Sequence, residues 1–362
     1  MIEPATAEEL ADELSAAQAA GRTITLVGNN TKSLMAGPLM ESDVSISTRR
    51  LNRVLQYEPG DLTISVEAGI TYRELSAVLA ERRQMIPLDP PFSANATMGG
   101  IVASNSSGPR RRLYGTARDM VIGMTFATLE GKLIQTGGMV VKNVAGLDMG
   151  KLMIGSFGTL AAIAVVNFKL HPMPAVSRTF VRRFDKVGDA IPVCDAVLKS
   201  VLQPAAIDLL KQSDGCELYV QAAGNTGVLD RYSREFEGAE VLEGETEQAL
   251  WTRLREFTPS MLAAHASMAV VRISCPLSEV GKTLESLPAP ALARAGSGVC
   301  YGYFEDPAEA AGRGVIEFAP QAVRETAALW PSPGSDFAMM EKIKQMFDPG
   351  RLLNRRRLYG RI

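Results

Sequence analysis

Residues 87–115 read PLDPPFSANATMGGIVASNSSGPRRRLYG, and the expected architecture follows from this stretch more than from any other. Glycine, serine, asparagine and proline dominate it, so it is poor at forming long elements and good at bringing backbone N–H groups close to a ligand. Irregular segments of this length are uncommon inside a compact domain unless they bind something. The stretch therefore predicts a binding loop.

Two further polar turns lie on either side of this stretch. Gly28-Asn29-Asn30-Thr31-Lys32 follows a strand expected at 23–27, and Gly155-Ser156-Phe157-Gly158-Thr159 precedes an apolar strand expected at 160–170. Backbone amides exposed on three loops suit a long, flat, anionic ligand. On these residues alone, ordinary turns are an equally good interpretation.

Strands, loops and capped helices follow one another in the first 174 residues. Thr6 with Glu9, and Thr71 with Glu74, have the capping-box spacing, which predicts helices at 6–20 and from Thr71 onward. Further strands are expected at 62–67, 120–129 and 132–135. This succession indicates an α/β or α+β arrangement.

A domain boundary is expected at His171-Pro172-Met173-Pro174, because two prolines in three residues end the preceding strand. The region after it has no dense Gly/Ser/Asn segment. It is therefore expected to form a separate unit that shapes the protein and does not bind the cofactor. A final helix at 337–347 precedes the basic run Arg355-Arg356-Arg357. The middle unit is expected to contain strands at 178–183, 217–222, 268–275 and 299–304 and helices at 187–200 and 246–256.

The bulk composition excludes several classes of protein. The 38 Lys plus Arg nearly balance the 40 Asp plus Glu, which argues against nucleic acid as the main partner. The densest basic point before the carboxyl end, Arg110-Arg111-Arg112, is only three residues long and is more typical of a solvated loop or an anion contact. No apolar run reaches the ~18–20 residues of a membrane span, and no leader is visible, so a soluble intracellular chain is expected. The four cysteines form no C-x-x-C pair and are interpreted as small buried hydrophobes, and the two isolated histidines predict no metal site.

The common nucleotide and acyl-transfer signatures are missing. The sequence contains no G-x-x-x-x-G-K-[ST], no G-x-G-x-x-G after a first strand and no G-x-S-x-G. A phosphate-binding loop of the Walker type, a Rossmann fold and a hydrolase nucleophile elbow are therefore unsupported.

A set of short motifs, taken in order and spacing, resembles a known family. The set is dense over residues 24–174, thin over the middle unit, and resumes at 342–359. It is similar to the smaller, E-type FAD-binding subunit of bacterial glycolate oxidase, within the p-cresol methylhydroxylase / vanillyl-alcohol oxidase-type FAD-binding superfamily. The motifs are 51–54, 57–59, 66–69, 84–91, 96–100, 107–111, 114–115, 118–119, 137–138, 141–148, 151–160, 347–349, Asn354 and 357–359.

The resemblance implies an α+β protein with a two-part FAD-binding domain at 1–174, an inserted α+β cap domain at 175–330 and a C-terminal return segment at 331–362. It also implies which residues hold the cofactor, with glycines permitting close approach and hydroxyls bonding the ribityl and phosphate oxygens. The implied residues are Gly28, Asn29, Asn30, Thr31, Lys32, Thr97, Gly99, Gly100, Ser104, Asn105, Ser107, Gly108, Gly155, Ser156, Gly158, Thr159 and the backbone of Ile163.

The chain departs from the family pattern at a few positions. Asn29-Asn30 stands where consecutive glycines are usual, Ala161 replaces a glycine, and Arg355-Arg356 stands where Pro-Gly is more common. Asparagine tolerates left-handed backbone angles better than other non-glycine residues, so the turn can survive. The loops around 28–32 and 93–115 contain no histidine or cysteine, which predicts noncovalent FAD.

A flavin that oxidises a 2-hydroxy acid needs a cation for the carboxylate and a base for the hydroxyl. Related dehydrogenases use a metal held by histidines and a glutamate, and this chain has no such cluster. Arg110, Arg111, Lys142 and Lys151 are more readily interpreted as loop or phosphate contacts, so no catalytic residue is assigned.

The resemblance then implies a flavin-carrying subunit that works with a larger flavin subunit and an iron–sulfur subunit to oxidise a small 2-hydroxy acid, glycolate to glyoxylate. The expected location is cytoplasmic, with peripheral association with the inner membrane through the partners left open. Two alternatives remain. One is a stand-alone FAD-dependent dehydrogenase that anchors its substrate by arginine, and the other is a scaffold subunit that has lost flavin through Asn29-Asn30.

Overall fold

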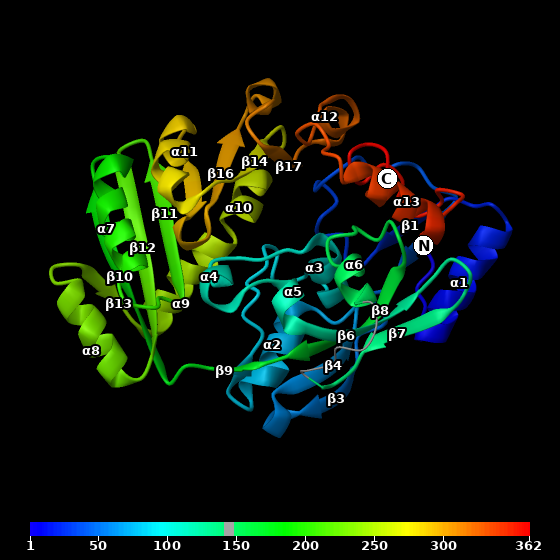
Figure 1. The fold of residues 1–362 in the computed structure, drawn as a ribbon, viewed down its shortest axis with the longest axis horizontal. Helices are drawn as coiled ribbons and strands as arrows, with labels where there is room; N and C mark the ends of the chain where they lie inside the picture. The colour runs from blue at the N-terminus through cyan, green and yellow to red at the C-terminus, as the bar shows by residue number, and fades with distance from the viewer. Residues whose placement is uncertain (141–147) are drawn as a thin grey trace. The chain divides into compact units, whose positions relative to one another are not determined.

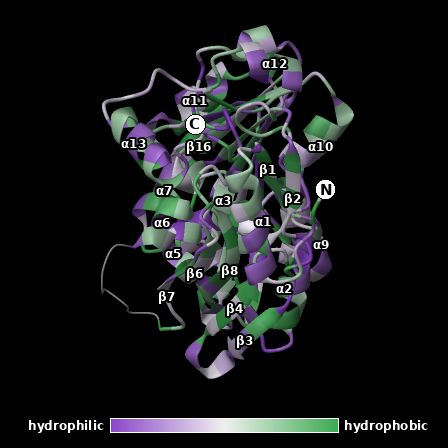
Figure 2. Ribbon diagram, turned by 90° about the vertical axis from the view of Figure 1, so that its right-hand side faces the viewer, coloured by the Kyte–Doolittle hydropathy of each residue, from purple (hydrophilic) through white to green (hydrophobic). Residues whose placement is uncertain are grey.

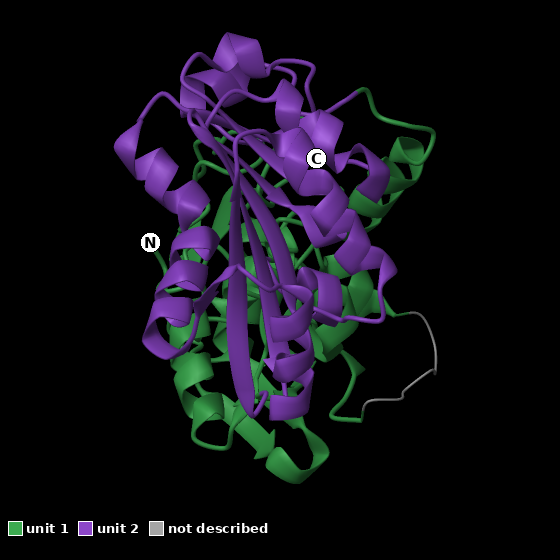
Figure 3. Cartoon of the chain, turned by 90° about the vertical axis from the view of Figure 1, so that its left-hand side faces the viewer, with its two compact units in different colours: residues 1–107, 116–173, 332–362 green, residues 108–115, 174–331 purple. Residues whose placement is uncertain are grey.

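The computed structural model describes residues 1–140 and 148–362, so Lys142 and most of the motif at 141–148 lie outside the described residues. The chain divides into two compact units, shown in Figure 3. Unit 1 comprises residues 1–107, 116–173 and 332–362, and unit 2 comprises residues 108–115 and 174–331. Residues 108–115, expected in the first domain, group with unit 2 because α4 (Arg111–Tyr114) packs against strands of that unit.

A five-stranded antiparallel sheet forms the centre of unit 1 (Figure 1). Every residue of β4 is buried, with Ile64 and Val66 on one face of the sheet and Thr63, Ser65 and Glu67 on the other. Strand β8 is mostly apolar at its buried positions, which is why the run at 160–170 reads as an apolar strand. The strand order is β3 (Val54–Glu58), β4 (Thr63–Glu67), β8 (Ala162–Lys169), β6 (Val121–Ala127) and β7 (Leu133–Gly137).

A parallel pair, β1 (Ile24–Val27) and β2 (Val44–Ser47), lies beside helix α1 (Ala7–Ala19) in one hydrophobic cluster. Leu10 and Leu14 of α1 are fully buried there together with Leu353 from the C-terminal segment. Ile24 forms a parallel bridge with Leu353, so the end of the chain is bound to its beginning.

The remaining elements of unit 1 are short. Helix α13 is amphipathic, and hydrophilic and hydrophobic residues alternate along it in Figure 2. Among the described residues no helix is both long and apolar enough to span a bilayer. These elements are α2 (Tyr72–Ala80), β5 (Gln84–Met85), α3 (Met98–Ser104), α5 (Ala117–Met120), α6 (Met149–Met153), β9 (His171–Pro172) and α13 (Phe337–Phe347).

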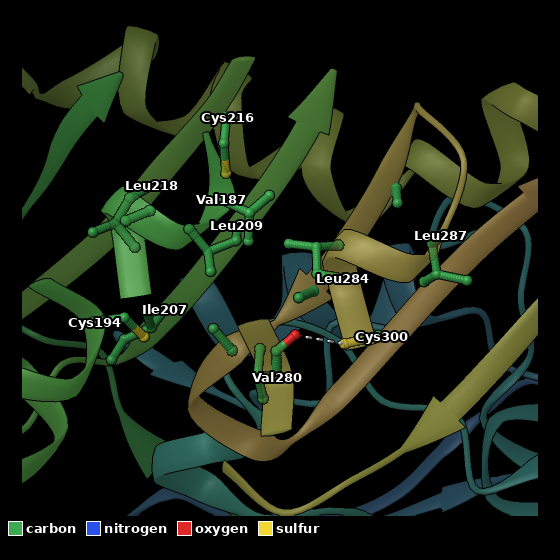
Figure 4. Packing of buried hydrophobic residues seen from close by; sticks show 14 of the residues in the cluster. Val187, Cys194, Ile207, Leu209, Cys216, Leu218, Val280, Leu284, Leu287 and Cys300 are labelled. Carbon is green, nitrogen blue, oxygen red and sulfur yellow. Dashed lines mark hydrogen bonds between the residues drawn. The ribbon is translucent and has the colours of Figure 1, made fainter. Parts of the chain in front are cut away.

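An eight-stranded antiparallel sheet forms the frame of unit 2. One face packs against α7 (Val187–Lys199), α8 (Thr226–Glu235) and α11 (Val280–Ser286), and a close view of this core appears in Figure 4. The strand order is β13 (Glu240–Leu242), β10 (Val176–Phe184), β12 (Gly215–Gly224), β11 (Ala206–Gln212), β15 (Ala291–Arg294), β16 (Val299–Phe304), β14 (Ala269–Ser274) and β17 (Val315–Phe318).

The other face of this sheet is polar where α9 (Gly244–Arg255) meets it. Glu247 of α9 is buried and accepts hydrogen bonds from Ser177, Thr179 and Gln221. A buried carboxylate with three donors is a satisfied structural anchor, because each donor replaces a lost water contact. Two short helices, α10 (Phe257–Ala264) and α12 (Gln321–Thr326), complete the unit.

The cysteines behave as small hydrophobes, as expected. Cys194, Cys216 and Cys300 are buried and Cys275 is partly exposed. Burial raises the pKa of Cys194 to about 12 and of Cys216 to about 11, because an apolar surrounding disfavours the thiolate. Thiols held neutral in this way are unreactive.

Most elements expected from the sequence are present, with ends that differ by a few residues. The helix at 337–347 and the strand at 299–304 have the expected bounds. Several elements were not expected, among them β2, β11, β15, β17 and α8. The seven-residue helix α3 lies inside the 87–115 stretch, because the Thr97 hydroxyl accepts a hydrogen bond from the Gly100 N–H and starts a helix there.

Candidate functional site

A pocket of about 100 Å³ in unit 1 is formed by segments that are far apart in the sequence. This volume has room for a diphosphate rather than for a whole dinucleotide, since pockets for drug-sized ligands measure roughly 300–1,000 Å³. The lining residues are Leu26, Val27, Gly28, Asn29, Asn30, Thr31, Lys32, Leu39, Thr97, Gly100, Ala103, Ser104, Phe157, Asn354 and Arg357.

The loop after β1 forms one wall of the pocket. The Ser47 hydroxyl donates to the Gly28 carbonyl at 3.0 Å, and the Asn29 side chain donates to the Asn95 carbonyl at 3.0 Å. Asn30 has a φ of 54°, in the left-handed region. Asparagine is among the few non-glycine residues that adopt this conformation routinely, so the loop keeps its turn without a glycine at this position.

The same loop presents hydrogen-bond donors in succession. The backbone N–H groups of Asn29, Asn30 and Thr31 donate to no other group in the described part of the chain. Lys32 and Arg357, which also line the pocket, supply positive charge. Consecutive backbone donors beside cationic side chains are a favourable environment for an anion, and the donor set fits a diphosphate.

Helix α3 approaches this loop closely at one point. A Cβ atom on Gly28 would lie 2.2 Å from the Thr97 hydroxyl oxygen, so no side chain fits at position 28. Gly99 has a different task, because its Cβ would lie 2.7 Å from that of Ala68 and its N–H donates to the Ala68 carbonyl at 2.7 Å. Gly99 therefore docks α3 against the end of β4 and does not line the pocket.

The turn at 155–159 packs against α3 from another side. The N–H of Gly155 donates to the Val102 carbonyl at 3.1 Å, and that of Phe157 donates to the Ala103 carbonyl at 2.8 Å. These bonds place the Phe157 ring in the pocket lining, with the Arg357 guanidinium 5.8 Å from its centre. An arginine over an aromatic face is attracted by the ring quadrupole, which fixes both side chains.

Asn354, from the C-terminal segment, connects two walls of the pocket. Its side-chain N–H groups donate to the carbonyls of Leu26 at 3.1 Å and Phe157 at 2.8 Å, and its oxygen accepts the Leu26 N–H at 2.8 Å. One side chain thus joins β1 to the 155–159 turn. The sequence marked Asn354 as part of the family's tail, but nothing in its local pattern connected it with a pocket more than 300 residues earlier.

Lys344 of α13 holds this C-terminal segment in place. Its buried ammonium donates to the carbonyls of Thr159 at 2.7 Å and Leu353 at 3.2 Å and to the Asp348 carboxylate at 2.6 Å. Burial lowers the pKa of Lys344, and the bond to Asp348 opposes that shift. The sequence gave no sign of this role, because a lysine on an amphipathic helix is usually solvated.

The predicted site residues therefore fall into two groups. Those that line the pocket are Gly28, Asn29, Asn30, Thr31, Lys32, Thr97, Gly100 and Ser104. Gly99, Asn105, Ser107, Gly155, Ser156, Gly158, Thr159 and Ile163 belong to unit 1 without lining it, and Gly108 groups with unit 2. Of these, Asn105 is of interest because its side-chain oxygen is buried without a hydrogen-bond partner in the described residues.

The candidate cations of the sequence analysis are dispersed. Lys151 pairs with Asp148 at 3.1 Å in a solvated contact, and Arg111 lies in α4 of unit 2. Arg110 also groups with unit 2, and Lys142 lies outside the described residues. None of the three described residues lines the pocket.

Known proteins resemble this chain in sequence and in fold. Residues 1–137 match a family model described as an FAD binding domain. The chain is 32% identical over 234 residues to "Glycolate oxidase subunit GlcE" of Escherichia coli (strain K12), covering 64% of this chain and 63% of that protein. It is 34% identical over 169 residues to "D-lactate dehydrogenase [cytochrome], mitochondrial" of Arabidopsis thaliana, covering 47% of this chain and 30% of the relative. The chain thus spans less than two thirds of the length of either relative.

A solved structure shares the fold over nearly the whole chain. Crystalline p-cresol methylhydroxylase with substrate bound superposes with a TM-score of 0.75 at 15% identity, covering 99% of this chain and 88% of the other. The expected α+β fold, with a two-part domain and an inserted unit, is confirmed. Together with the family match over residues 1–137, this gives the chain an FAD-binding domain and the fold of p-cresol methylhydroxylase, and its cofactor is FAD.

Proposed function

We propose that this chain binds FAD noncovalently and is the flavin-carrying subunit of a complex that oxidises a small 2-hydroxy acid, glycolate to glyoxylate. The observation that carries the proposal is the pocket at the end of β1, where a loop with three available N–H donors meets α3 and the C-terminal segment. Bound FAD would supply the acceptor for the hydride that leaves the substrate in such an oxidation.

The residues of the pocket account for the diphosphate part of the cofactor. Asn29, Asn30 and Thr31 would donate backbone hydrogen bonds to it, and Lys32 would offset its charge. The remainder of a dinucleotide is longer than the pocket. We infer that it runs past Gly100 and Ser104 toward the buried, unbonded oxygen of Asn105.

The assignment to a complex is supported by the name of one relative, "Glycolate oxidase subunit GlcE". We propose a larger flavin subunit and an iron–sulfur subunit as partners. The proposed location is the cytoplasm, where the partner subunits would bring the complex into peripheral contact with the inner membrane. A stand-alone FAD-dependent dehydrogenase is the second candidate, favoured by the likeness to a D-lactate dehydrogenase.

One purification distinguishes these functions. The chain is isolated alone and together with co-purifying partners, its visible spectrum is recorded, and turnover of glycolate and D-lactate is assayed with an artificial electron acceptor. We expect a yellow protein that turns over glycolate only in the complex, since no catalytic base has been identified in this chain. Robust turnover by the isolated chain would establish the stand-alone enzyme instead. A colourless chain that still assembles would identify a scaffold subunit.

A further inference from the structure

A second, larger cavity of about 510 Å³ lies in unit 1, where the tail after α13 folds back on itself. Four arginines line it, namely Arg351, Arg355, Arg356 and Arg361. It shares no lining residue with the pocket described above. It contains the Arg355-Arg356 pair that departs from the family pattern, and the proposed function does not use it.

The side chains that line this cavity carry more positive than negative charge. None of the four guanidiniums forms an ion pair within the described residues, although Arg351 donates to the Arg361 carbonyl at 2.7 Å and Arg355 to the Glu41 carbonyl at 2.5 Å. Lys344, which also lines the cavity, is paired with Asp348. Glu341 is the one acidic side chain among the described residues of the lining, and Asp43 outside the lining interacts electrostatically with Arg355. Because the chain as a whole carries a net charge of −2, this concentration of cations is local.

The arginines are held at fixed positions by the backbone. A Cβ on Gly37 would lie 2.0 Å from the Arg356 carbonyl oxygen, so the two segments are in direct contact. The Gly37 N–H donates to the Arg357 carbonyl at 2.9 Å, and the Arg357 side chain donates to the Gly37 carbonyl at 2.7 Å. Arg351 and Arg356 have positive φ values of 50° and 63°. Each such angle is strained for a residue other than glycine, and the surrounding contacts maintain it.

We propose that this cavity binds a small polyanion that carries a phosphate group. Guanidinium groups bind phosphate oxygens in a bidentate geometry. Four of them offer more charge and more donors than a ligand with a single carboxylate could use. The volume lies within the range of small-molecule pockets, and a hollow of this size suits a metabolite better than an extended strand or a membrane surface. The proposal goes beyond the proposed function and does not depend on it.

The test is a calorimetric titration of the full chain, with whatever flavin it carries, using pyrophosphate as the probe at low ionic strength. Arg356→Gln/Arg361→Gln is compared with Arg22→Gln/Arg231→Gln, which changes the net charge equally at exposed arginines elsewhere. We expect the wild type and the control to bind alike and the cavity variant to lose about tenfold or more in affinity. Arg356→Lys/Arg361→Lys keeps the charge but loses the bidentate donor geometry of the guanidinium group. Its affinity for pyrophosphate should lie between that of the wild type and that of the Arg356→Gln/Arg361→Gln variant.

Several results would overturn the proposal. One is equal pyrophosphate affinity in the cavity variant and the control. Another is loss of flavin absorbance in the cavity variant, because the cavity would then belong to the flavin site. Tighter binding of an acidic peptide than of pyrophosphate would assign the cavity to a protein partner. Circular dichroism and the melting temperature check folding, and the single variant Arg356→Gln serves if the double variant unfolds. A colourless wild type would count against the proposed function only, since the titration remains readable.

Discussion

Gly28 and Thr97 approach each other closely in the lining of the pocket at the end of β1. A Cβ at position 28 would approach the Thr97 hydroxyl oxygen to 2.2 Å, and Thr97 is held in place as the cap of α3. We expect Gly28→Ala to push the loop away from α3 at a cost of about 1–3 kcal/mol, which corresponds to a loss of FAD affinity of roughly 5- to 160-fold. The loss of affinity is measured as the flavin content per mole of purified protein.

Gly60→Ala is the matched control for that change. A Cβ at Gly60 meets nothing within 4 Å, and the residue lies in a short turn of the same unit. The control should retain its flavin. Equal flavin content in both variants would show that the loop at 28–32 does not hold the cofactor.

At the level of elements, α13 depends on a buried pair of charges. The Lys344 ammonium and the Asp348 carboxylate are 1% and 0% exposed, so neither can recover a water contact if the other is removed. We expect Lys344→Ala to destabilise the folded chain by about 3 kcal/mol and to lower the urea midpoint. The exposed Lys342→Ala on the same helix should change the midpoint little. Similar midpoints for both variants would contradict the anchoring role.

The capping box of α2 has a pH signature. Hydrogen bonds from the Thr71 hydroxyl and N–H lower the pKa of Glu74 below its ordinary value of 4.5. A carboxylate with a lowered folded-state pKa contributes stability that is present above its unfolded pKa and is lost as the pH falls through the folded value. Thr71→Ala should therefore cost about 1 kcal/mol near neutral pH, and this difference should shrink below pH 4.5.

Urea midpoints of wild type and Thr71→Ala at about pH 7 and about pH 3.5 measure that difference. Ser76→Ala, within the same helix, is the control and should show no such pH dependence. A difference between wild type and Thr71→Ala that stays constant with pH would mean that Glu74 is not part of the cap.

At the scale of the whole molecule, the attachment of the flavin is testable in one step. The residues lining the proposed FAD site include no histidine or cysteine, the side chains to which a flavin can be attached covalently. We expect acid precipitation of the protein to release the yellow colour, with absorbance near ~450 nm, into the supernatant. A yellow pellet would show a covalent bond and would require an attachment point outside these lining residues.

Local signals in the sequence were sufficient for many elements. The Thr71–Glu74 box, the apolar run at 162–169 and the helix at 337–347 depend on neighbouring residues, whose spacing is visible in the chain itself. The loop residues 28–32 were predicted in the same way, from a strand followed by polar turn formers. Short strands such as β15 and β17 were missed because four residues carry too little periodicity to distinguish a strand from a loop.

Only the tertiary structure decided which distant segments share a site. Asn354 reaches Leu26 and Phe157, and Lys344 reaches the Thr159 carbonyl, through hydrogen bonds whose partners are separated by up to 328 residues. Nothing in the local sequence specifies such a bond, because it forms only after packing has brought both groups into a place without water. The sequence by itself therefore determined many of the elements, the turn chemistry and the resemblance to FAD-binding proteins. The walls of the pocket and the arginine-lined cavity were determined by how the end of the chain folds back onto its beginning.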